Sequence, residues 1–297
     1  MKFKRFAKVL LSCVLAGALV TGCGGGQDTA DKSATDKSAS NFSASELKLG
    51  MVTRLNTDEE TMGGVLDKFA ENIGVKGTKH LPKFYDKFNA MQMGLEAGEI
   101  EAVSTYNSVA NYVVAQNDKF QIVQNDALNK ITDAFCFAVR KDDTQLRDDL
   151  NKVIDEMKAD GSLDKLINDY VTNVNKGETP PVVEIQTIDG AETIKVGVTG
   201  DMPPLDLILA DNSPAGFNTA MLAEIAKRLG RNVEPVQIDS GARATALNSK
   251  FIDVVFWVVV PFGNNDMPAD LDKPEGLELS KPYFQDNVAV IKLKANK

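Results

Sequence analysis

The fold of this chain is decided by the stretch AMQMGLEAGEIEAV at residues 90–103, together with RATALNSKFIDVVFW at residues 243–257. In each stretch apolar residues first recur at helical spacing, small and polar residues then interrupt the pattern, and a short apolar run follows. This order predicts a helix, a turn and a strand. Because the pattern occurs twice, we expect an internal repeat.

Each stretch is preceded, about fifty residues earlier, by a short apolar strand with a glycine in the same place, at residues 47–52 and 194–199. Amphipathic helices are expected in between, at Thr57–Ile73 and Thr219–Leu229. Strands that alternate with helices predict right-handed βαβ units and mainly parallel sheets. The two copies therefore predict an α/β protein of two lobes.

The N-terminus has the pattern of an export signal. The apolar run Val9–Val20 is shorter than the roughly 20 residues of a membrane-spanning helix, and it follows a basic segment. The run closes on Leu19–Cys23, which resembles the bacterial lipobox and predicts a lipid on Cys23. The alternative is a retained anchor with an incidental cysteine. Residues 24–45 are rich in Gly, Ser, Asp, Lys and Ala, which is typical of a flexible tether.

Charge and cysteine content narrow the class of protein. Without the signal the chain has 29 basic and 42 acidic residues, a net charge of about −13, which argues against nucleic acid and against adhesion to acidic lipids. No later apolar stretch is long enough to span a bilayer. Cys136 is the one cysteine left after processing and lipidation, so no disulfide is expected, and its apolar neighbours predict a buried thiol.

Four segments are informative together: GDMPPL at 200–205, AGFN at 215–218, LAEIAKRLG at 222–230 and LSKPYF at 279–284. They resemble the opening lobe of the family 3 extracellular solute-binding proteins, which have the periplasmic-binding-protein-like type II fold. Residues 47–125 resemble the second lobe of that family, and residues 137–170 resemble its closing helices. The resemblance implies two lobes of mainly parallel sheets joined by hinge strands.

In the family the opening lobe comes first, whereas here its counterpart comes last, so the chain resembles a circular permutation of the fold. Opening the chain beside a surface hinge strand is tolerable. The alternative is a fusion of two truncated paralogues. The expected organisation is a lipoprotein signal peptide at 1–22, a tether at 23–45, a second-lobe-like lobe at 46–139, closing helices that pack on the other lobe at 140–172, a linker at 173–191 and a first-lobe-like lobe ending in a hinge strand at 192–297.

The charged anchors of the amino-acid-binding members are missing. Those members hold the ligand carboxylate with a Thr and an Arg after the strand that ends here at Trp257, but residues 258–265 contain neither. They hold the ligand ammonium with an Asp after the corresponding second-lobe strand, where residues 104–107 read STYN. The resemblance therefore leaves the binding of a standard α-amino acid in the usual pose open.

Loop positions suggest replacements in the first-lobe-like half, because ligands of α/β sheets bind beyond the carboxyl ends of the strands. Arg243 is the candidate clamp for an anion, or else an exposed residue of a helix first turn. Trp257, expected at a strand exit, is a candidate platform in the cleft or a core residue. Asp201 and Asp206 are candidates for an ammonium group, and Asp206 equally for a solvated position.

In the other half the same rule selects Arg54, Asn56, Thr57, Tyr106 and Asn107. Arg54 is placed to meet an anion at a helix start, or to point outward. Thr57 has capping-box spacing with a glutamate three residues later, so it is expected to cap the helix first and to contact ligand second. Tyr106 offers an aromatic face and a hydroxyl, and Asn107 either orients a polar group or caps the next helix.

These features predict a lipid-anchored, extracytoplasmic substrate-binding component of an ABC importer for a small polar, amino-acid-like solute. The expected partners are the solute and an ABC permease and ATPase, with the membrane contacted through the lipid alone, no nucleic acid and a monomeric state. No cofactor or metal is expected, since His80 is the sole histidine and we expect it in a loop before Pro82. The alternatives are a sensory or signalling lipoprotein and an enzyme on this fold, such as a dehydratase, although no catalytic acid and base pair is evident.

Overall fold

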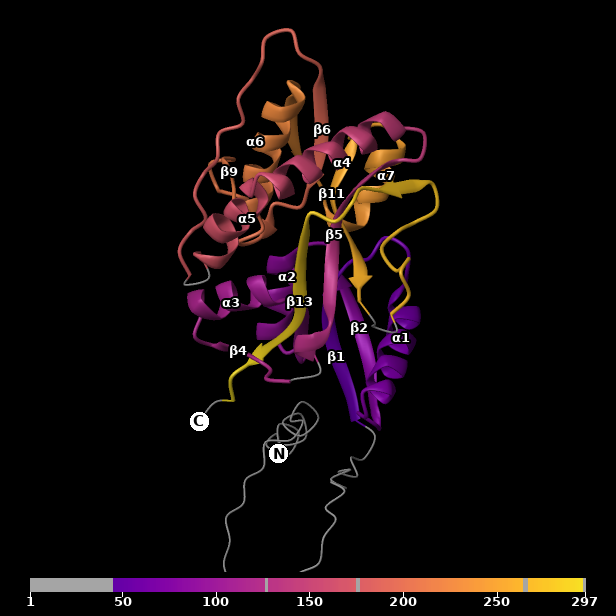
Figure 1. The fold of residues 1–297 in the computed structure, drawn as a ribbon. Helices are drawn as coiled ribbons and strands as arrows, with labels where there is room; N and C mark the ends of the chain where they lie inside the picture. The colour runs from indigo at the N-terminus through magenta and orange to yellow at the C-terminus, as the bar shows by residue number, and fades with distance from the viewer. Residues whose placement is uncertain (1–44, 126–127, 175–176, 264–266, 296–297) are drawn as a thin grey trace, which may run out of the picture.

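The computed structural model describes residues 45–125, 128–174, 177–263 and 267–295, which form two α/β lobes stacked end to end (Figure 1). We call residues 45–131 the N-terminal lobe and residues 193–283 the C-terminal lobe. The predicted signal peptide and the lipobox with Cys23 lie outside the described residues. Within the described part, no helix is long and apolar enough to cross a membrane.

The N-terminal lobe is a small parallel sheet between helices. Strand β1 pairs in parallel with both β2 and β3, while α1 covers one face of this sheet and α2 and α3 cover the other (Figure 1). The elements are β1 (Ser45–Val52), α1 (Glu59–Asn72), β2 (Thr78–Tyr85), α2 (Phe88–Glu96), β3 (Ala102–Tyr106), α3 (Asn107–Gln116), β4 (Phe120–Ile122) and the 3₁₀ turn η2 (Leu128–Lys130).

The C-terminal lobe repeats this arrangement, with β6 paired in parallel with both β10 and β11. A small antiparallel sheet of β7, β8 and β9 lies beside the first turn of α6. The elements are β6 (Thr193–Val198), β7 (Asp201–Met202), β8 (Asp206–Ile208), β9 (Pro214–Ala215), α6 (Phe217–Leu229), β10 (Asn232–Gln237), the 3₁₀ turn η4 (Ser240–Ala242), α7 (Arg243–Asn248), β11 (Val254–Phe262) and β12 (Leu277–Leu279).

Two long strands, β5 (Thr132–Arg140) and β13 (Phe284–Leu293), cross between the lobes and join their sheets into one. The start of β13 pairs antiparallel with β5, and its continuation from Val288 pairs antiparallel with β3. The strand order is β10-β6-β11-β5-β13-β3-β1-β2, so each lobe keeps parallel strands at its own end of the sheet. The predicted α/β class with two lobes joined by hinge strands is confirmed.

The helices that follow β5 lie against the C-terminal lobe. Helices α4 (Thr144–Ala159) and α5 (Ser162–Ile167), with the π-turn η3 (Asn168–Thr172), contact α6. Arg228 on α6 donates hydrogen bonds to Asp160 and Ser162, both at 2.8 Å. The pKa of Asp160 is lowered to about 2 by the hydrogen bonds from Ser162 and Arg228. These helices therefore pack on the C-terminal lobe, although they follow the N-terminal lobe and β5 in the sequence.

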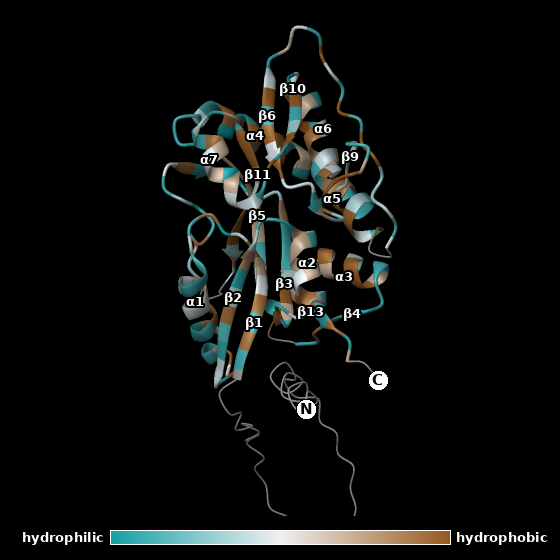
Figure 2. Ribbon diagram, turned by 180° about the vertical axis from the view of Figure 1, so that it is seen from behind, coloured by the Kyte–Doolittle hydropathy of each residue, from teal (hydrophilic) through white to brown (hydrophobic). Residues whose placement is uncertain are grey.

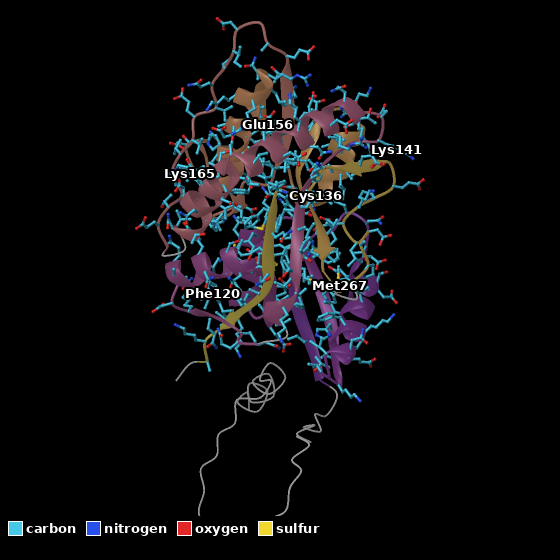
Figure 3. All side chains as sticks on the ribbon, viewed as in Figure 1. Phe120, Cys136, Lys141, Glu156, Lys165 and Met267 are labelled. Atoms are coloured by element: carbon cyan, nitrogen blue, oxygen red, sulfur yellow. The ribbon has the colours of Figure 1, made fainter. Side chains whose placement is uncertain are left out.

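The crossing strand β5 is buried along most of its length because its sequence is almost continuously apolar. Cys136 sits at its centre, as Figure 3 shows, and burial raises the pKa of its thiol to about 11, in agreement with the predicted buried cysteine. Its neighbour Phe137 contacts Phe256 and Tyr283, with ring centroids at 5.1 and 4.5 Å. The hydrophobic residues of both lobes meet on the strands at the middle of the molecule (Figure 2).

Two local expectations are wrong. The first helix begins at Glu59, and Asp58, not Thr57, caps it by accepting a hydrogen bond from the Thr61 amide at 2.7 Å. His80, expected in a loop, lies on β2, where its ring Nδ1 is 2.8 Å from Asp67. Asp58 and Thr57 are neighbours that can both cap a helix, and the parallel pairing of Leu47 with His80 extends β2 through the histidine.

Candidate ligand-binding site

The two lobes meet where the loop after β1 faces η4, α7 and the loop between β11 and β12. Arg243 lies at the centre of this contact, with 1% of its surface exposed. Its guanidinium donates to the carbonyls of Ser240 at 2.8 Å and Trp257 at 2.6 Å in its own lobe, and to the Thr53 carbonyl at 3.0 Å across the contact. The alternative of an exposed first-turn residue is therefore wrong, because the guanidinium ties the lobes together.

Trp257 lies beside Arg243 but within β11, not at the strand exit that its sequence position suggested. The strand continues to Phe262 because its second half pairs antiparallel with β5. The guanidinium carbon of Arg243 is 3.9 Å from the indole centroid, within cation–π range. The indole lines a cavity of about 10 Å³ among Phe135, Met202 and Leu205, and its buried Nε1 has no partner among the described residues. Trp257 is thus a core residue that also borders the contact between the lobes.

Arg54 and Tyr106 face this pair from the N-terminal lobe. Arg54 donates to the Tyr106 hydroxyl at 3.4 Å, and that hydroxyl donates to Asp133 at 3.0 Å. Burial by itself lowers the pKa of Arg54, but Tyr106, Asp272 and Asp133 outweigh it and hold the pKa above its ordinary value. The alternative in which Arg54 points outward is wrong, because its Nε is buried and has no partner within the described part of the chain.

A residue that the sequence patterns did not indicate, Asp272, completes this group. It is fully buried on the loop between β11 and β12. Its Oδ1 accepts from the Leu55 amide at 2.8 Å and from Arg243 at 3.4 Å, while its Oδ2 accepts from the Val259 amide at 3.1 Å. In the sequence, Asp272 lies in an acidic segment that has no metal-binding pattern. Only the fold shows that Asp272 contacts the N-terminal lobe.

The two acids proposed for an ammonium group are engaged within the protein. Asp206 is buried and accepts from the amide and hydroxyl of Thr199 at 2.8 and 2.9 Å, so the solvated alternative is wrong. Asp201 reaches across the lobes and accepts from the Phe88 amide at 2.7 Å, at the start of α2. That helix has no side-chain cap of its own, so a carboxylate from the other lobe satisfies its first amide.

The remaining candidates lie at the edges of this region. Asn56 is exposed, and its side chain donates to the Asp270 carbonyl at 2.9 Å, while Thr57 bonds locally to the Asp58 carbonyl at 3.4 Å. Asn107 is exposed as the first residue of α3, and the cap position itself is Tyr106. The contact between the lobes thus brings Arg54, Tyr106, Arg243 and Trp257 together, whereas Asn56, Thr57 and Asn107 stay peripheral.

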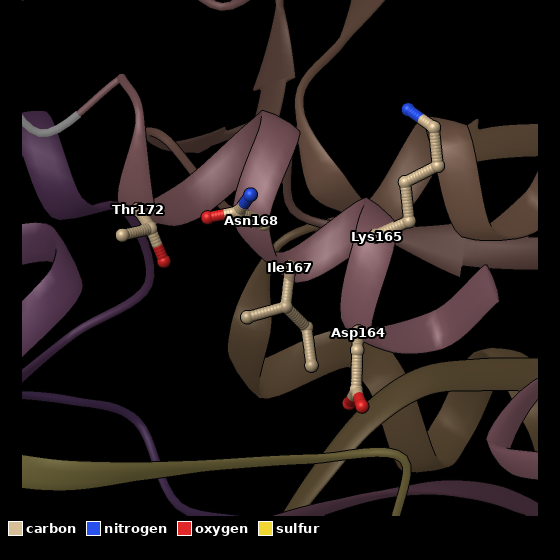
Figure 4. A pocket seen from close by; sticks show the side chains of 5 residues that line it. All are labelled: Asp164, Lys165, Ile167, Asn168 and Thr172. Atoms are coloured by element: carbon tan, nitrogen blue, oxygen red, sulfur yellow. The ribbon is translucent and has the colours of Figure 1, made fainter. Parts of the chain in front are cut away.

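Other depressions lie away from this contact. One of about 520 Å³ on the outer face of α5 and η3 is lined by Asp164, Lys165, Ile167, Asn168 and Thr172 (Figure 4). None of the residues that the sequence indicated lines it. Within the described ranges, no group of three or more His, Cys, Asp or Glu side chains is arranged to hold a metal ion.

The burial of Asp201 predicts a pH effect on stability. Burial raises its pKa to about 6, against the hydrogen bonds from α2, so between about pH 4 and 6 the folded protein holds a proton that the unfolded chain releases. Stability contributed by this group is therefore present at low pH and lost as the pH rises through 6. Asp201→Asn cannot ionise, and we expect its melting temperature to fall less than that of the wild type between pH 4.5 and 7.5.

Melting curves at the two pH values measure this difference. Asp118→Asn, which removes one exposed negative charge from the N-terminal lobe, serves as the control. Asp206 and Asp133 also have raised pKa values through burial, but both are present in every variant and cancel in the comparison. Identical pH profiles for wild type and Asp201→Asn would contradict the assignment.

Comparison with known sequences decides the family. The sequence pattern of the bacterial extracellular solute-binding proteins, family 3, matches residues 64–173 and 194–297, which include the N-terminal lobe apart from β1 and the start of α1, the C-terminal lobe, both crossing strands and the closing helices. The chain belongs to this family. A binding protein for a small molecule follows from membership. No curated protein sequence matches the chain.

Solved structures with a similar arrangement are distant in sequence. The periplasmic aliphatic sulphonate binding protein SsuA from Escherichia coli is 12% identical, with a TM-score of 0.37 over 84% of this chain and 66% of that one. A periplasmic substrate-binding protein of an ABC transporter from Coxiella burnetii is 13% identical, with a TM-score of 0.37 over 82% and 84%. CbnR, a LysR family transcriptional regulator, is 11% identical, with a TM-score of 0.40 over 86% of this chain and 65% of its own, so this chain spans less than two thirds of that regulator.

Proposed function

We propose that this protein is the substrate-binding component of an ABC importer and that it closes its two lobes around a small polar, amino-acid-like solute. The observation that carries the proposal is membership of a solute-binding family across both lobes. The polar groups where the lobes meet are consistent with it. Arg54, Tyr106 and Asp133 come from one side, and Arg243 and Asp272 come from the other.

The crossing strands β5 and β13 allow the two lobes to move relative to each other. Among the described strands, β5 and β13 lead from one lobe into the other, and they lie side by side at the centre of the sheet. A bend in two adjacent strands lets the lobes separate as rigid bodies. A solute that contacts groups from both lobes then favours the closed arrangement, and the membrane permease recognises that arrangement.

The proposed contacts follow from which donors remain available. The Nε of Arg54 and the Nε1 of Trp257 are buried, and neither has a hydrogen-bond partner among the described residues. Both can therefore donate a hydrogen bond to an acceptor on a solute. Tyr106 adds a hydroxyl beside Arg54. Asn56, Thr57 and Asn107 would form the rim of the site, and Asp201 and Arg243 would be exposed to solute only when the lobes part.

A ligand screen tests the proposal. Purified protein starting at Ser45 would be melted with each of the standard amino acids, and with small amines, amides and organic acids, and each hit would be titrated by calorimetry. A genuine ligand raises the melting temperature, because the folded state gains a stability of RT ln(1 + L/Kd), where L is the concentration of free ligand. Trp257→Phe removes the indole N–H while keeping an aromatic ring and should weaken binding. Tight binding without uptake by cells would instead favour a sensory role.

We also propose that the protein is a lipoprotein held on the extracytoplasmic face through Cys23. The family is extracellular, and the sequence at Leu19–Cys23 resembles the lipobox. Cys23→Ser is expected to abolish lipid attachment and leave the precursor uncleaved, because the acylated thiol is what the signal peptidase recognises. Metabolic labelling with palmitate measures this, and Cys13→Ser inside the apolar run is the control. Labelling that persists in Cys23→Ser would refute the anchor.

The order of the lobes is proposed to be a circular permutation. Two observations support this proposal. The strands β5 and β13 cross between the lobes, and the helices α4 and α5 pack on α6 of the C-terminal lobe. In a rearranged gene, residues 192–295 would precede residues 45–174, with a short flexible join between β13 and β1. If the permutation is correct, the protein made from the rearranged gene folds to the same secondary structure as the natural protein and binds the same solutes. If the halves are fused truncated copies, the rearranged protein loses both properties.

A further inference from the structure

The described part of the loop between β11 and β12, residues 267–276, reaches the N-terminal lobe and lies beside α1 in Figure 1. Leu271 packs against the core of β1 and α1, and its carbonyl accepts from the Asn56 amide at 3.2 Å. The Asp270 carbonyl accepts from the Asn56 side chain at 2.9 Å. These contacts hold Asp272 in place between the lobes.

The groups that donate hydrogen bonds to the Asp272 carboxylate favour an anion at this position. The Leu55 and Val259 amides and the Arg243 guanidinium donate to it, and one amide comes from each lobe. Arg54 is close enough to interact electrostatically with the same carboxylate. Two guanidinium groups and two backbone amides form the kind of donor set that binds a carboxylate in proteins. No part of the carboxylate is exposed to solvent.

We propose that Asp272 is a built-in occupant of an anion-binding position between the lobes and thereby determines specificity. It supplies the negative charge that Arg243 and the two amides would otherwise take from a solute. The inference rests on the proposed solute-binding function. The wild-type protein then selects against solutes whose carboxylate must bind at this position, and it can close without an anion from solution.

The proposal also accounts for the charge balance. A buried arginine without a counter-ion is strongly disfavoured, and burial lowers the pKa of Arg243 while Asp272 opposes that shift. In a site that relied on an anionic solute, the arginine would lose its partner each time the solute left. An internal carboxylate keeps Arg243 paired whether or not a solute is present.

Removal of the carboxylate should uncover the site. In Asp272→Ala we expect sodium formate or acetate at 100 mM to raise the melting temperature by about 3 °C or more over sodium chloride at the same concentration and pH, because a small carboxylate replaces the missing one. In contrast, the melting temperature of the wild type should not differ between the three salts, and the same should hold for Asp270→Ala. Asp270 is exposed on the same loop, and its main-chain contact to Asn56 is retained in the variant.

A second variant and a second readout protect the test. Asp272→Ser keeps one acceptor for the Leu55 amide and leaves room for formate, and it replaces Asp272→Ala if that variant does not fold. Small-angle scattering should show a larger radius of gyration for the variant in chloride and a return to the wild-type value in formate. Equal melting temperatures of the folded variant in formate and chloride would overturn the proposal. Rescue by formate without any hit in the solute screen would support the proposed role of Asp272 but not the transport role. A hit in the screen without rescue by formate would support the transport role but not the role of Asp272.

Discussion

Replacing Arg243 with alanine is expected to lower the free energy of unfolding by about 3–5 kcal/mol, the range for removal of one partner of a buried ion pair. The variant leaves the carboxylate of Asp272, which is 0% exposed, without its cation. It also removes the donors to the carbonyls of Ser240, Trp257 and Thr53, of which the last lies on the other lobe. Urea denaturation followed by circular dichroism measures the change.

The matched control is Arg147→Ala on α4. Arg147 pairs with the exposed neighbouring Asp148 at 2.8 Å, and a pair of this kind contributes about 0–1 kcal/mol. The prediction therefore requires the two arginines to differ several-fold in their effect. Equal losses in the two variants would mean that the buried ion pair of Arg243 and Asp272 adds nothing beyond an ordinary surface pair.

Replacing Phe256 with alanine is expected to cost about 3–5 kcal/mol, as for other large-to-small changes in a packed core. The side chain is fully buried on β11, and its ring contacts Phe137 at 5.1 Å and Tyr283 at 5.3 Å between centroids. Tyr283 in turn donates to the Phe256 carbonyl at 2.9 Å. This cluster fixes the end of the C-terminal lobe from which both crossing strands emerge.

Phe251→Ala is the control for Phe256, since it removes the same side chain from the turn before the same strand, where 58% of its surface is exposed. Its expected effect is within about 0.5 kcal/mol, as for most surface changes. Melting and urea titration of both variants measure the difference. If Phe256→Ala were as stable as Phe251→Ala, the aromatic cluster would not hold the crossing strands.

Sequence patterns predicted the elements well where the pattern is local. The helices expected at Thr57–Ile73 and Thr219–Leu229 are observed at Glu59–Asn72 and Phe217–Leu229, because apolar spacing reports one buried face of a helix. Sequence patterns failed where the position of a residue depends on pairing with a distant strand. Trp257 was expected at a strand exit, but antiparallel pairing with β5 extends β11 past it to Phe262.

The candidate site divides in the same way. Strand ends and loops drew attention to Arg54, Tyr106, Arg243 and Trp257, and the fold brings these four residues into one region. Asp272 carried no signal of its own, because it lies in an acidic loop whose position depends on contacts with residues more than 200 positions earlier. Periodicity and loop rules do not reach over that separation.

The sequence by itself determined the α/β class, the two lobes and the family, since these follow from repeated local patterns of apolar residues, glycines and turns. Only the tertiary structure decided which polar groups are bound to partners within the protein. Asp201, Asp206 and Arg243 are all polar residues at strand ends or in turns, yet their partners come from the other lobe or from within the core. A buried charge must find a partner wherever the fold places one, and the identity of that partner is set by the folding of the whole chain.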